Sequence, residues 1–376
     1  MPDYSLKGFI PHPISTEYPP EKRRYQGIPT LEVLPSGRLL VVYYAGVLKE
    51  EGPGNYVVLA CSDDHGLSWQ EIQIIAPPSG AKERAFDPVL WLDPCGHLWW
   101  CWSQGVSHGM SDIFDGRNGV WAAVCKKPQA STLKWSSPRR LGEGVQMCKP
   151  TILQDGSWAF PAALWNYWPE KVAPEFKGLA RSNLLLSKDQ GKSFTLLPGP
   201  DIPERVFDEH VLIEHPDGSW DIFARTIYGI GKSTSRNQGK TWSRGRDSGL
   251  GGPSSRFALR RLRSGKLLLI NNETPQLLPG EKRKGYPRQK LIAWLSADEG
   301  TSWYGRLVFE NRNNVSYPDL AEAEDGFIYV VYDRERTTAG EILIARFREA
   351  DVAAGTFQTP GSYSALVVTA YPAKHS

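Results

Sequence analysis

The stretch EDGFIYVVYD, residues 324–333, joins a turn containing glycine to a long apolar run, and the same combination occurs six times in the chain. The other copies are PSGRLLVVYY (35–44), PCGHLWWCWS (94–103), QDGSWAFPAA (154–163), PDGSWDIFAR (216–225) and RSGKLLLINN (263–272). Glycine supplies the positive φ that a tight hairpin needs, and an alternating apolar run is typical of a half-buried strand. The spacing of 47–62 residues leaves room for four strands per copy. The repeats predict an all-β fold, a six-bladed β-propeller in which the run after each glycine forms the inner strand.

A second motif recurs in a different phase, with the pattern Ser-x-Asp/Asn-x-Gly-x-Ser/Thr followed by an aromatic residue. It occurs at 62–69, 187–194, 235–242 and 296–303. In such a turn the short polar side chains bond the hairpin backbone, glycine takes the left-handed position and the ring packs on the sheet. We therefore expect a structural role for it. The motif is missing from the second and sixth repeats, although TLKWSSP around Trp135 has the look of a degenerate copy.

The composition fits a large β-protein with an aromatic core, since the 376 residues include 14 Trp, 15 Tyr, 36 Gly and 29 Pro. All-β architectures of this length fold as one unit, so we expect residues 1–376 to form a single domain. The net charge of +3, with acids and bases interleaved, predicts no nucleic-acid partner. The five cysteines contain no CxxC pair, and no motif indicates a metal or another cofactor.

The N-terminal segment has no basic head followed by an apolar run, and no stretch approaches the ~18 apolar residues of a membrane span. These features predict a soluble cytoplasmic protein without a membrane partner. A leader segment preceding this sequence would indicate a secreted protein instead. The oligomeric state is left open.

The repeated Ser-x-Asp-x-Gly hairpins resemble the Asp-boxes of the sialidase-like superfamily, and the resemblance covers nearly the whole chain. It implies a glycosidase in which a tyrosine, activated by a glutamate, attacks the anomeric carbon. A carboxylate nucleophile would be repelled by the carboxylate of the sugar, and enzymes of this kind are an exception to the usual pair of catalytic carboxylates. The resemblance also implies an aspartate that acts as acid and base, and three arginines that hold the sugar carboxylate.

Three segments stand at the catalytic positions that the resemblance implies. VSYPDLAEAEDG places Tyr317 at the position of the nucleophile, where the alternative is one more buried tyrosine of the propeller. FDEHVLIEHPDG places Glu209 at the position of the activating glutamate. Where the aspartate is expected, LKEEGPGN has Glu51, which can donate a proton if its pKa is raised. The alternative for Glu51 is an exposed loop acid.

Two of the three arginine positions are also filled. Arg225 ends the apolar strand of DIFAR, where an unpaired guanidinium would be costly, and Arg288 precedes the last Asp-box in PRQKLIAWLS. For Arg288 the alternative is a solvated residue in a basic run. At the position of the first arginine, YQGIPT has Gly27, so one of the three arginines that would hold the sugar carboxylate is missing. Arg24 and Arg84 are the candidates to replace this arginine.

Several other charged or aromatic residues adjoin the ends of predicted inner strands. Because inner strands run along the propeller axis, we expect these side chains to form a basic pocket with an aromatic floor. The predicted substrate-binding residues among them are Arg84, Asp87, Lys149, Trp165 and Arg256, and the same segments contain Asp115, Arg117, Asn166 and Arg205. Such a pocket suits an acidic sugar, whereas the alternative for about half of these residues is a role in salt bridges between blades.

Three functions are compatible with these residues. The first is an exo-acting glycoside hydrolase for a terminal acidic sugar, with Tyr317, Glu209 and Glu51 in the catalytic roles. The second is a lyase acting on a uronate, in which a tyrosine or histidine would be the base, with His108 and His210 as the candidates. The third is a propeller that binds carbohydrate without catalysis, which the departures at Gly27 and Glu51 favour.

Overall fold

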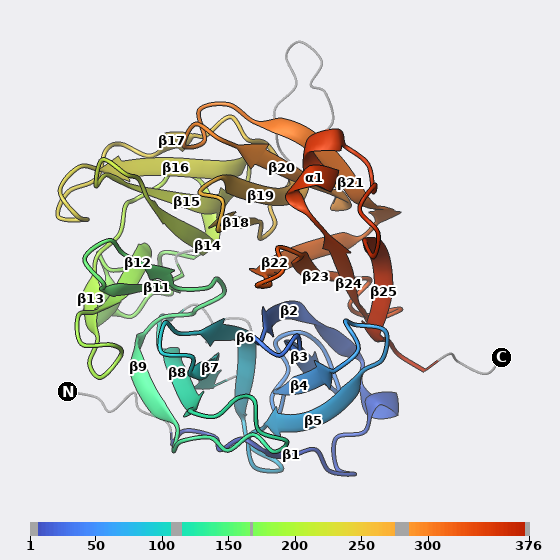
Figure 1. Ribbon diagram of the computed structural model, residues 1–376. Coiled ribbons are helices and arrows are strands. Elements are labelled where there is room, and N and C mark those ends of the chain that lie inside the picture. The colour runs from blue at the N-terminus through green and yellow to red at the C-terminus, as the bar shows by residue number, and fades with distance from the viewer. Residues whose placement is uncertain (1–6, 107–114, 166–167, 275–285, 373–376) are drawn as a thin grey trace.

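The computed structural model describes residues 7–106, 115–165, 168–274 and 286–372, which form six antiparallel sheets around a central axis (Figure 1). The first blade contains β2 (Tyr25–Val33), β3 (Leu39–Gly46), β4 (Tyr56–Ser62) and β5 (Gln70–Ile75), with β1 (His12–Pro13) added beside β5. The second contains β6 (Glu83–Leu92), β7 (Leu98–Val106), β8 (Gly119–Cys125) and β9 (Arg139–Glu143). The third contains β10 (Thr151–Ile152), β11 (Trp158–Ala163), β12 (Ser182–Ser187) and β13 (Thr195–Leu197).

The second half of the chain repeats this order. The fourth blade contains β14 (Arg205–Glu214), β15 (Trp220–Thr226), β16 (Gly229–Ser235) and β17 (Arg246–Asp247). The fifth contains β18 (Ala258–Arg261), β19 (Leu267–Asn272), β20 (Gln289–Ser296) and β21 (Tyr304–Asn313), and the sixth contains β22 (Val315–Glu322), β23 (Ile328–Arg334), β24 (Glu341–Phe347) and β25 (Tyr363–Thr369). Short helices are η1 (Pro20–Lys22), η3 (Pro174–Phe176) and α1 (Glu349–Ala354). The predicted six-bladed β-propeller is confirmed.

The glycine turns join the innermost strand of each blade to the second strand. Gly218 and Gly326, for example, have φ values of +80° and +82°. The sequence predicted that the apolar run after each glycine forms the innermost strand. This prediction is wrong, because the run forms the second strand of its blade. β3 follows the first of these turns and is buried along its whole length, while β2 packs against β6 and β22 nearer the axis. The second strands read as continuous apolar runs because neighbouring blades cover both of their faces.

The hydrophobic core lies between the blades. Each of the six interfaces between neighbouring blades has its own cluster of buried side chains. Between the second and third blades, the rings of Trp91 and Trp158 meet edge to face at 4.9 Å. Aromatic pairs of this geometry contribute beyond the area that they bury, which explains the use of so many tryptophans.

The Asp-box hairpins connect the third strand of a blade to the fourth. In the first blade, Asp64 accepts hydrogen bonds from the Ser68 backbone at 2.9 Å and from the hydroxyls of Ser62 and Ser68 at 2.7 and 2.5 Å. Gly66 donates its N–H to Ser62, and Trp69 donates its indole N–H to the Gly66 carbonyl. The serine–aspartate bonds and the glycine N–H bond recur in the third and fifth blades, as expected for structural hairpins.

The second and sixth blades fill the position of the Asp-box differently. Trp135 lies between β8 and β9, packs against Trp100 at 5.4 Å and donates to Gln73 at 2.7 Å. In the sixth blade, α1 lies between β24 and β25, and its Asp351 accepts hydrogen bonds from three backbone N–H groups and the Ser362 hydroxyl. A buried acid that organises the loop is thus present in the sixth blade without the motif.

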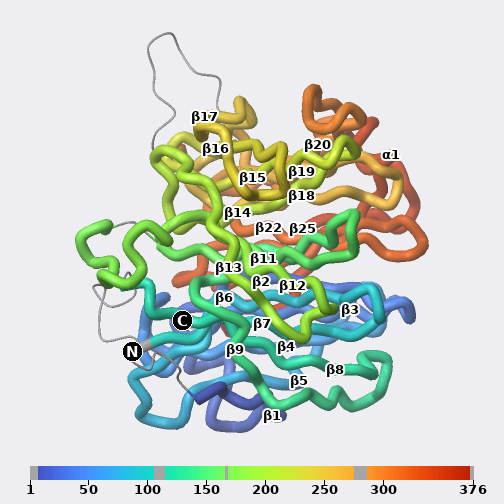
Figure 2. The backbone as a smooth tube through the Cα atoms, turned by 90° about the vertical axis from the view of Figure 1, so that its left-hand side faces the viewer, coloured from blue at the N-terminus to red at the C-terminus, as the bar shows by residue number. Residues whose placement is uncertain are grey.

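The ring closes by contacts between its first and sixth blades, which lie side by side in Figures 1 and 2. Each of the two blades is built from one continuous stretch of chain, so no strand is exchanged between them. Instead, Asp333 accepts the backbone N–H of Ile28 at 2.8 Å, and Asp319 accepts that of Leu31 at 2.9 Å. These buried carboxylates satisfy backbone groups on β2 that would otherwise lack a partner.

Candidate active site

Four of the innermost strands are interrupted at the end remote from the glycine turns. β2, β6, β14 and β22 each lose pairing register there. The break contains a residue with positive φ in every case: Ile28 at 55°, Asp87 at 48°, Phe207 at 60° and Tyr317 at 55°. This conformation costs a non-glycine residue about 1–2 kcal/mol, and a bulge redirects its side chain. All four side chains line one cavity, so the repeated strain marks this end of the channel as a candidate site.

The cavity has a volume of about 150 Å³. It is lined by Ile28, Tyr44, Glu50, Glu51, Arg84, Asp87, Met147, Trp165, Phe207, Glu209, Arg225, Arg288, Tyr317 and Arg336. Eight of the ten residues predicted from the sequence are among them. Pockets for drug-sized ligands measure ~300–1,000 Å³, so this cavity suits a smaller group such as one sugar residue.

Tyr317, Glu209 and Arg225 form a buried triad on the cavity floor. The Tyr317 hydroxyl donates a short hydrogen bond to Glu209. Arg225 Nη1 donates to Glu209 Oε1 at 2.8 Å and to the Tyr317 hydroxyl oxygen at 2.7 Å, and its Nε donates to Ser254 at 3.0 Å. The three residues come from β22, β14 and β15, so two blades supply the triad.

Burial raises the pKa of the Tyr317 hydroxyl to about 12, although the Arg225 guanidinium opposes the shift. The phenol is therefore neutral at neutral pH and needs a base before it can act as a nucleophile. Glu209 is placed to be that base, because it already accepts the phenolic proton. Arg225 holds the carboxylate of Glu209 and would stabilise the phenolate.

Two further arginines that line the cavity lie against the Tyr317 ring. The guanidinium of Arg288 lies 5.2 Å from the ring centroid, and that of Arg336 lies 4.0 Å from it. Arg288 donates to the Ser254 carbonyl at 3.1 Å and has no carboxylate partner among the described residues. Burial lowers the pKa of Arg288, which indicates that the protein alone balances its charge incompletely. This side of the cavity is therefore suited to an anion.

Sequence reasoning missed Arg336. It follows β23 in the segment YDRER and donates to Asp333 at 2.9 Å, to Glu50 at 3.3 Å and to Ser316 at 3.4 Å. The available signal was an arginine near the end of the second strand of its blade, which is also where Arg225 stands. In a run that contains several charged residues, that signal does not single out one arginine.

The loop between β3 and β4 carries Glu50 and Glu51 to the cavity. Asn55 fixes this loop by donating to the carbonyls of Lys49 and Glu50 at 2.7 and 2.8 Å and to the Tyr44 hydroxyl at 2.8 Å. Burial, and then the charge of Glu50, raises the pKa of Glu51. The structure thus places the predicted proton donor at the cavity in a setting that favours its protonated form.

Arg84 and Asp87 lie together on the wall formed by β6. Arg84 is 2% exposed, stacks on Phe86 at 3.9 Å and donates to the Tyr44 hydroxyl at 3.1 Å, while its Nε and Nη2 have no hydrogen-bond partner within the described part of the chain. Burial raises the pKa of Asp87 to about 8 despite the nearby Arg84. The wall thus presents a carboxyl group that is largely protonated at neutral pH.

An aromatic surface completes the cavity. Trp165 and Phe207 meet edge to face at 5.4 Å, and Phe207 lies 5.0 Å from the Arg225 guanidinium. Trp165 follows β11 and is 6% exposed. The predicted aromatic floor of the pocket is present at the cavity.

Lys149 and Arg256, both predicted to bind substrate, lie outside this cavity. Arg256 donates to the carbonyls of Met147, Pro29 and Tyr317 at 2.9, 2.6 and 2.8 Å. A cation bound to backbone carbonyls of three other blades holds the ring together, although its buried Nε has no hydrogen-bond partner among the described residues. We therefore correct the role of Arg256 to a structural one.

Lys149 is corrected in the same way. Its ammonium lies 2.9 Å from Glu32, 3.3 Å from Asp319 and 3.0 Å from the Leu320 carbonyl, and it also donates to the Leu31 carbonyl. All of these partners belong to the first and sixth blades, whereas Lys149 precedes β10 of the third. The protein thus already accepts hydrogen bonds from the three N–H donors of the ammonium.

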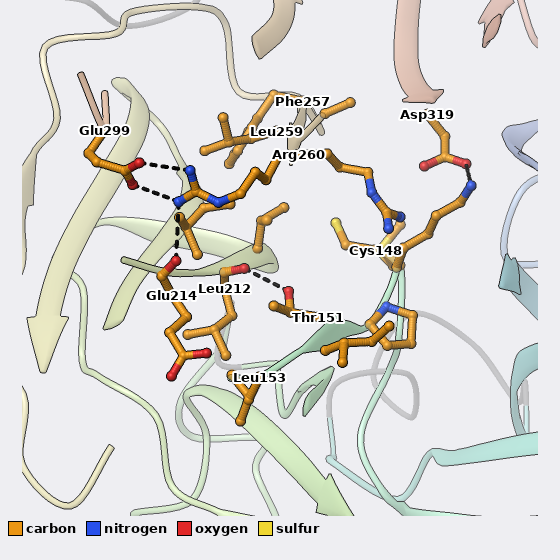
Figure 3. Close-up of a pocket in the computed structure, with 18 of the residues that line it drawn as sticks. Cys148, Thr151, Leu153, Leu212, Glu214, Phe257, Leu259, Arg260, Glu299 and Asp319 are labelled. Atoms are coloured by element: carbon orange, nitrogen blue, oxygen red, sulfur yellow. Dashed lines mark hydrogen bonds and ion pairs between the residues drawn. The ribbon is translucent and has the colours of Figure 1, made fainter. Parts of the chain in front are cut away.

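A larger cavity of about 800 Å³ occupies the other end of the channel, between the third, fourth and fifth blades (Figure 3). Figure 3 shows Cys148, Thr151, Leu212 and Arg260 around it, with Asp319 at one side. Its volume exceeds that of the smaller cavity, yet none of the predicted catalytic residues lines it. The chemistry of the triad, and not size, identifies the candidate site.

Other residues named from the sequence lie elsewhere. Both ring nitrogens of His210 contact backbone carbonyls, at 2.6 and 2.7 Å, and this residue does not line the cavity. Arg205 pairs with Asp208 at 2.8 Å, and Arg117 pairs with Asp115 at 3.1 Å. His108 and Asn166 lie outside the described residues. No helix of the described chain is long and apolar enough to cross a membrane, and no described group of His, Cys, Asp and Glu is arranged to hold a metal ion.

Residues 37–330 match the family described as the BNR repeat-like domain, and no curated protein matches the sequence. Among solved structures, the chain is similar to a protein of unknown function from Dyadobacter fermentans, with 17% identity and a TM-score of 0.62 over 91% of this chain and 97% of that one. It is similar to the intramolecular trans-sialidase of Ruminococcus gnavus solved with oseltamivir carboxylate, with 14% identity and a TM-score of 0.63 over 89% and 96%. It is also similar to the sialidase of Trypanosoma rangeli solved with the inhibitor DANA, with 14% identity and a TM-score of 0.62 over 84% of this chain and 54% of that one.

Six blades, Asp-box hairpins and a buried tyrosine–glutamate–arginine triad at one end of the channel place this protein in the class of sialidase-like propellers. The chain belongs to the BNR repeat-like family, whose model covers most of its length. The resemblance noted in the sequence is thus confirmed, and the similar structures share its fold.

Proposed function

We propose that this protein is an exo-acting glycoside hydrolase that removes a terminal acidic sugar from a glycan. The observation that carries the proposal is the buried triad, in which the Tyr317 hydroxyl is bonded to Glu209 and both are bridged by Arg225. A buried phenol that is paired with a carboxylate and opens on a cavity is arranged for nucleophilic catalysis. Two of the similar structures are named as a sialidase and an intramolecular trans-sialidase, which supports the proposal of a glycoside hydrolase.

The proposed reaction has two displacements. In the first, the Tyr317 oxygen bonds to the anomeric carbon while its proton passes to Glu209, and the bond to the leaving oxygen breaks as Glu51 donates its proton there. In the second, Glu51 takes a proton from a water molecule whose oxygen bonds to the anomeric carbon, the bond between that carbon and the Tyr317 oxygen breaks, and Glu209 returns its proton to Tyr317. Two displacements at one carbon retain the anomeric configuration.

An acidic substrate follows from the charges around the triad. Arg225 and Arg288 both bond Ser254 and both lie near Tyr317, and Arg288 has no carboxylate partner among the described residues. A sugar carboxylate bound between them would supply the missing negative charge through charge-assisted hydrogen bonds. The small cavity and the aromatic contact at Trp165 favour a single terminal residue over an internal segment of a polysaccharide.

The test is a panel of 4-methylumbelliferyl glycosides of N-acetylneuraminic acid, a deoxyoctulosonic acid and glucuronic acid, with galactose as the neutral comparison. We expect turnover of an acidic member, and loss of at least roughly a thousandfold in kcat for Tyr317→Phe. Tyr329→Phe is the matched control, since Tyr329 is a buried tyrosine of the same blade that does not line the cavity. Circular dichroism and melting temperature verify that the variants are folded.

The outcomes separate the three functions. Turnover that persists in Tyr317→Phe contradicts the covalent mechanism. An unsaturated uronate product, seen by its ultraviolet absorbance, would identify a lyase. Binding of an acidic sugar without any product would identify a carbohydrate-binding propeller.

A further inference from the structure

Gly27 and Arg336 compete for the same space beside the candidate site. A Cβ atom added at Gly27 would lie 2.8 Å from Cδ, 2.9 Å from Cγ and 2.9 Å from Nε of Arg336. Contacts this short are not tolerated, so one of the two side chains must move. Gly27 has no positive φ that would require glycine. The absence of a side chain at this position is therefore explained by the arginine that lies against it.

The position of the Arg336 side chain is fixed by hydrogen bonds within the sixth blade. Its Nε donates to Asp333 at 2.9 Å, and Asp333 also binds the backbone N–H of Ile28 and the Ser316 hydroxyl. The guanidinium plane then lies against the Tyr317 ring at 4.0 Å and lines the cavity. Arg336 thus enters the site from the same blade as Tyr317, whereas the glycine that makes room for it belongs to the first blade.

Arg336, Arg225 and Arg288 surround the Tyr317 side chain. Of the bonds that Arg336 makes, the one to Glu50 is long at 3.3 Å, and Glu50 stands on a loop with its side chain 38% exposed. An incoming carboxylate can replace this contact, since it is long and its acid belongs to a partly exposed loop residue. The Nη1 group is then the part of Arg336 that is available to an anion.

We propose that Arg336 is the third arginine of the carboxylate site, supplied by the sixth blade in the space that Gly27 leaves empty. The inference rests on the proposed function, because it assigns a specificity-determining contact for the acidic group of that substrate. It differs from the sequence-based candidates, since Arg84 lies on the β6 wall and Arg24 does not line the cavity. It also makes positions 27 and 336 a coupled pair.

The test measures the affinity for N-acetylneuraminic acid and glucuronic acid, and for their methyl esters, by titration calorimetry. Arg336→Ala is expected to weaken binding of the acid that the wild type prefers by roughly 10- to 100-fold, the range of a lost charge-assisted hydrogen bond. Binding of the corresponding ester should change much less. Arg334→Ala is the matched control, because Arg334 pairs with Glu335 and Glu341 and does not line the cavity.

The pair of positions gives a second readout. Gly27→Arg alone should weaken binding because two side chains then compete for one space, whereas Gly27→Arg combined with Arg336→Ala should recover most of the lost affinity. Equal affinity of wild type and Arg336→Ala for the acid, or losses that simply add in the double variant, would overturn the assignment of Arg336 alone. If the wild type binds neither these two acids nor a deoxyoctulosonic acid, the proposed function fails, and the carboxylate site fails with it. Melting temperatures separate lost binding from lost folding.

Discussion

At the scale of single residues, burial raises the pKa of both Tyr317 and Asp87, which makes the phenol harder to ionise and leaves the carboxyl group largely neutral at neutral pH. Both occupy the strained position of an innermost strand, and burial is the largest cause of the raised pKa of each. For Tyr317 this creates the need for a base, which Glu209 meets. For Asp87 it produces a group that can donate a hydrogen bond to a bound sugar at neutral pH. The same backbone conformation thus places a phenol from the sixth blade and a protonated carboxyl group from the second blade at the cavity.

The protonation of Asp87 predicts how stability depends on pH. Its pKa rises from an ordinary value of 3.8 to about 8 in the fold, so between these values the folded state holds a proton that the unfolded state has lost. Stability from this group is complete below pH ~4 and is lost as pH rises toward 8, by up to about 1.4 kcal/mol per pH unit. Asp87→Asn should remove this contribution and flatten the decline.

Denaturant unfolding of wild type and Asp87→Asn at several pH values between about 4 and 8 measures the effect. The difference in the free energy of unfolding should shift in favour of the variant as pH increases. Parallel pH profiles for the two proteins would show that Asp87 is ionised in the fold.

Residue-level chemistry was only partly predictable from the sequence. Tyr317, Glu209 and Arg225 were located because the residues that flank them, next to hairpin turns, resemble the corresponding segments of the sialidase-like superfamily. Arg336 was missed because its role depends on a glycine that is distant in sequence and adjacent only in the folded ring. Lys149 was assigned to the substrate for a related reason, since a lone lysine on an apolar strand does not reveal the two buried acids that neutralise it.

At the scale of the elements, the hairpins depend on backbone conformation more than on packing. The turn glycines of five blades, apart from that of the sixth, have no atom closer than 3.4 Å to a Cβ added at that position, and four of them have none within 4 Å. Steric contact therefore does not explain these glycines, whereas their φ values of +78° to +88° do. This local requirement is why the six-fold repeat could be recognised in the sequence. The order of strands from the axis outward is a property of packing and was misjudged by one strand.

Gly218→Ala tests this view at a turn where space is open. Alanine in the left-handed conformation should lower the free energy of unfolding by about 1 kcal/mol, and Gly218→Asn should cost less because asparagine tolerates that conformation better. Thermal and denaturant unfolding measure both variants. An alanine variant as stable as the wild type would show that the turn relaxes to another type.

At the scale of the whole molecule, buried cations bind the blades to one another across the channel. Arg256 of the fifth blade reaches carbonyls of the first, third and sixth blades, and Lys149 of the third reaches acids and carbonyls of the first and sixth. Because no strand is exchanged where the ring closes, such contacts supplement the apolar clusters between blades. Arg256 also bonds the carbonyl of Tyr317, so the same cation that links these blades supports the strained backbone of the candidate nucleophile.

Lys149→Met is the sharpest test of this arrangement. Methionine fills similar space but leaves Glu32 and Asp319 without their cation, and breaking a buried ion pair costs about 3–5 kcal/mol. We expect a loss of this order in the free energy of unfolding, with one cooperative transition retained if the chain is a single domain. Arg117→Ala, which breaks exposed ion pairs, should change stability by less than about 1 kcal/mol.

A double variant distinguishes lost charge balance from lost packing. Glu32→Gln removes one of the two acids that Lys149 neutralises, so Lys149→Met combined with Glu32→Gln should be less destabilised than the sum of the single changes, by roughly 1 kcal/mol or more. Denaturant unfolding of the four proteins in the cycle gives this coupling energy. Additive losses would mean that the ammonium acts through its carbonyl contacts at Leu31 and Leu320, and the ring would then be closed by hydrogen bonds instead of by charge.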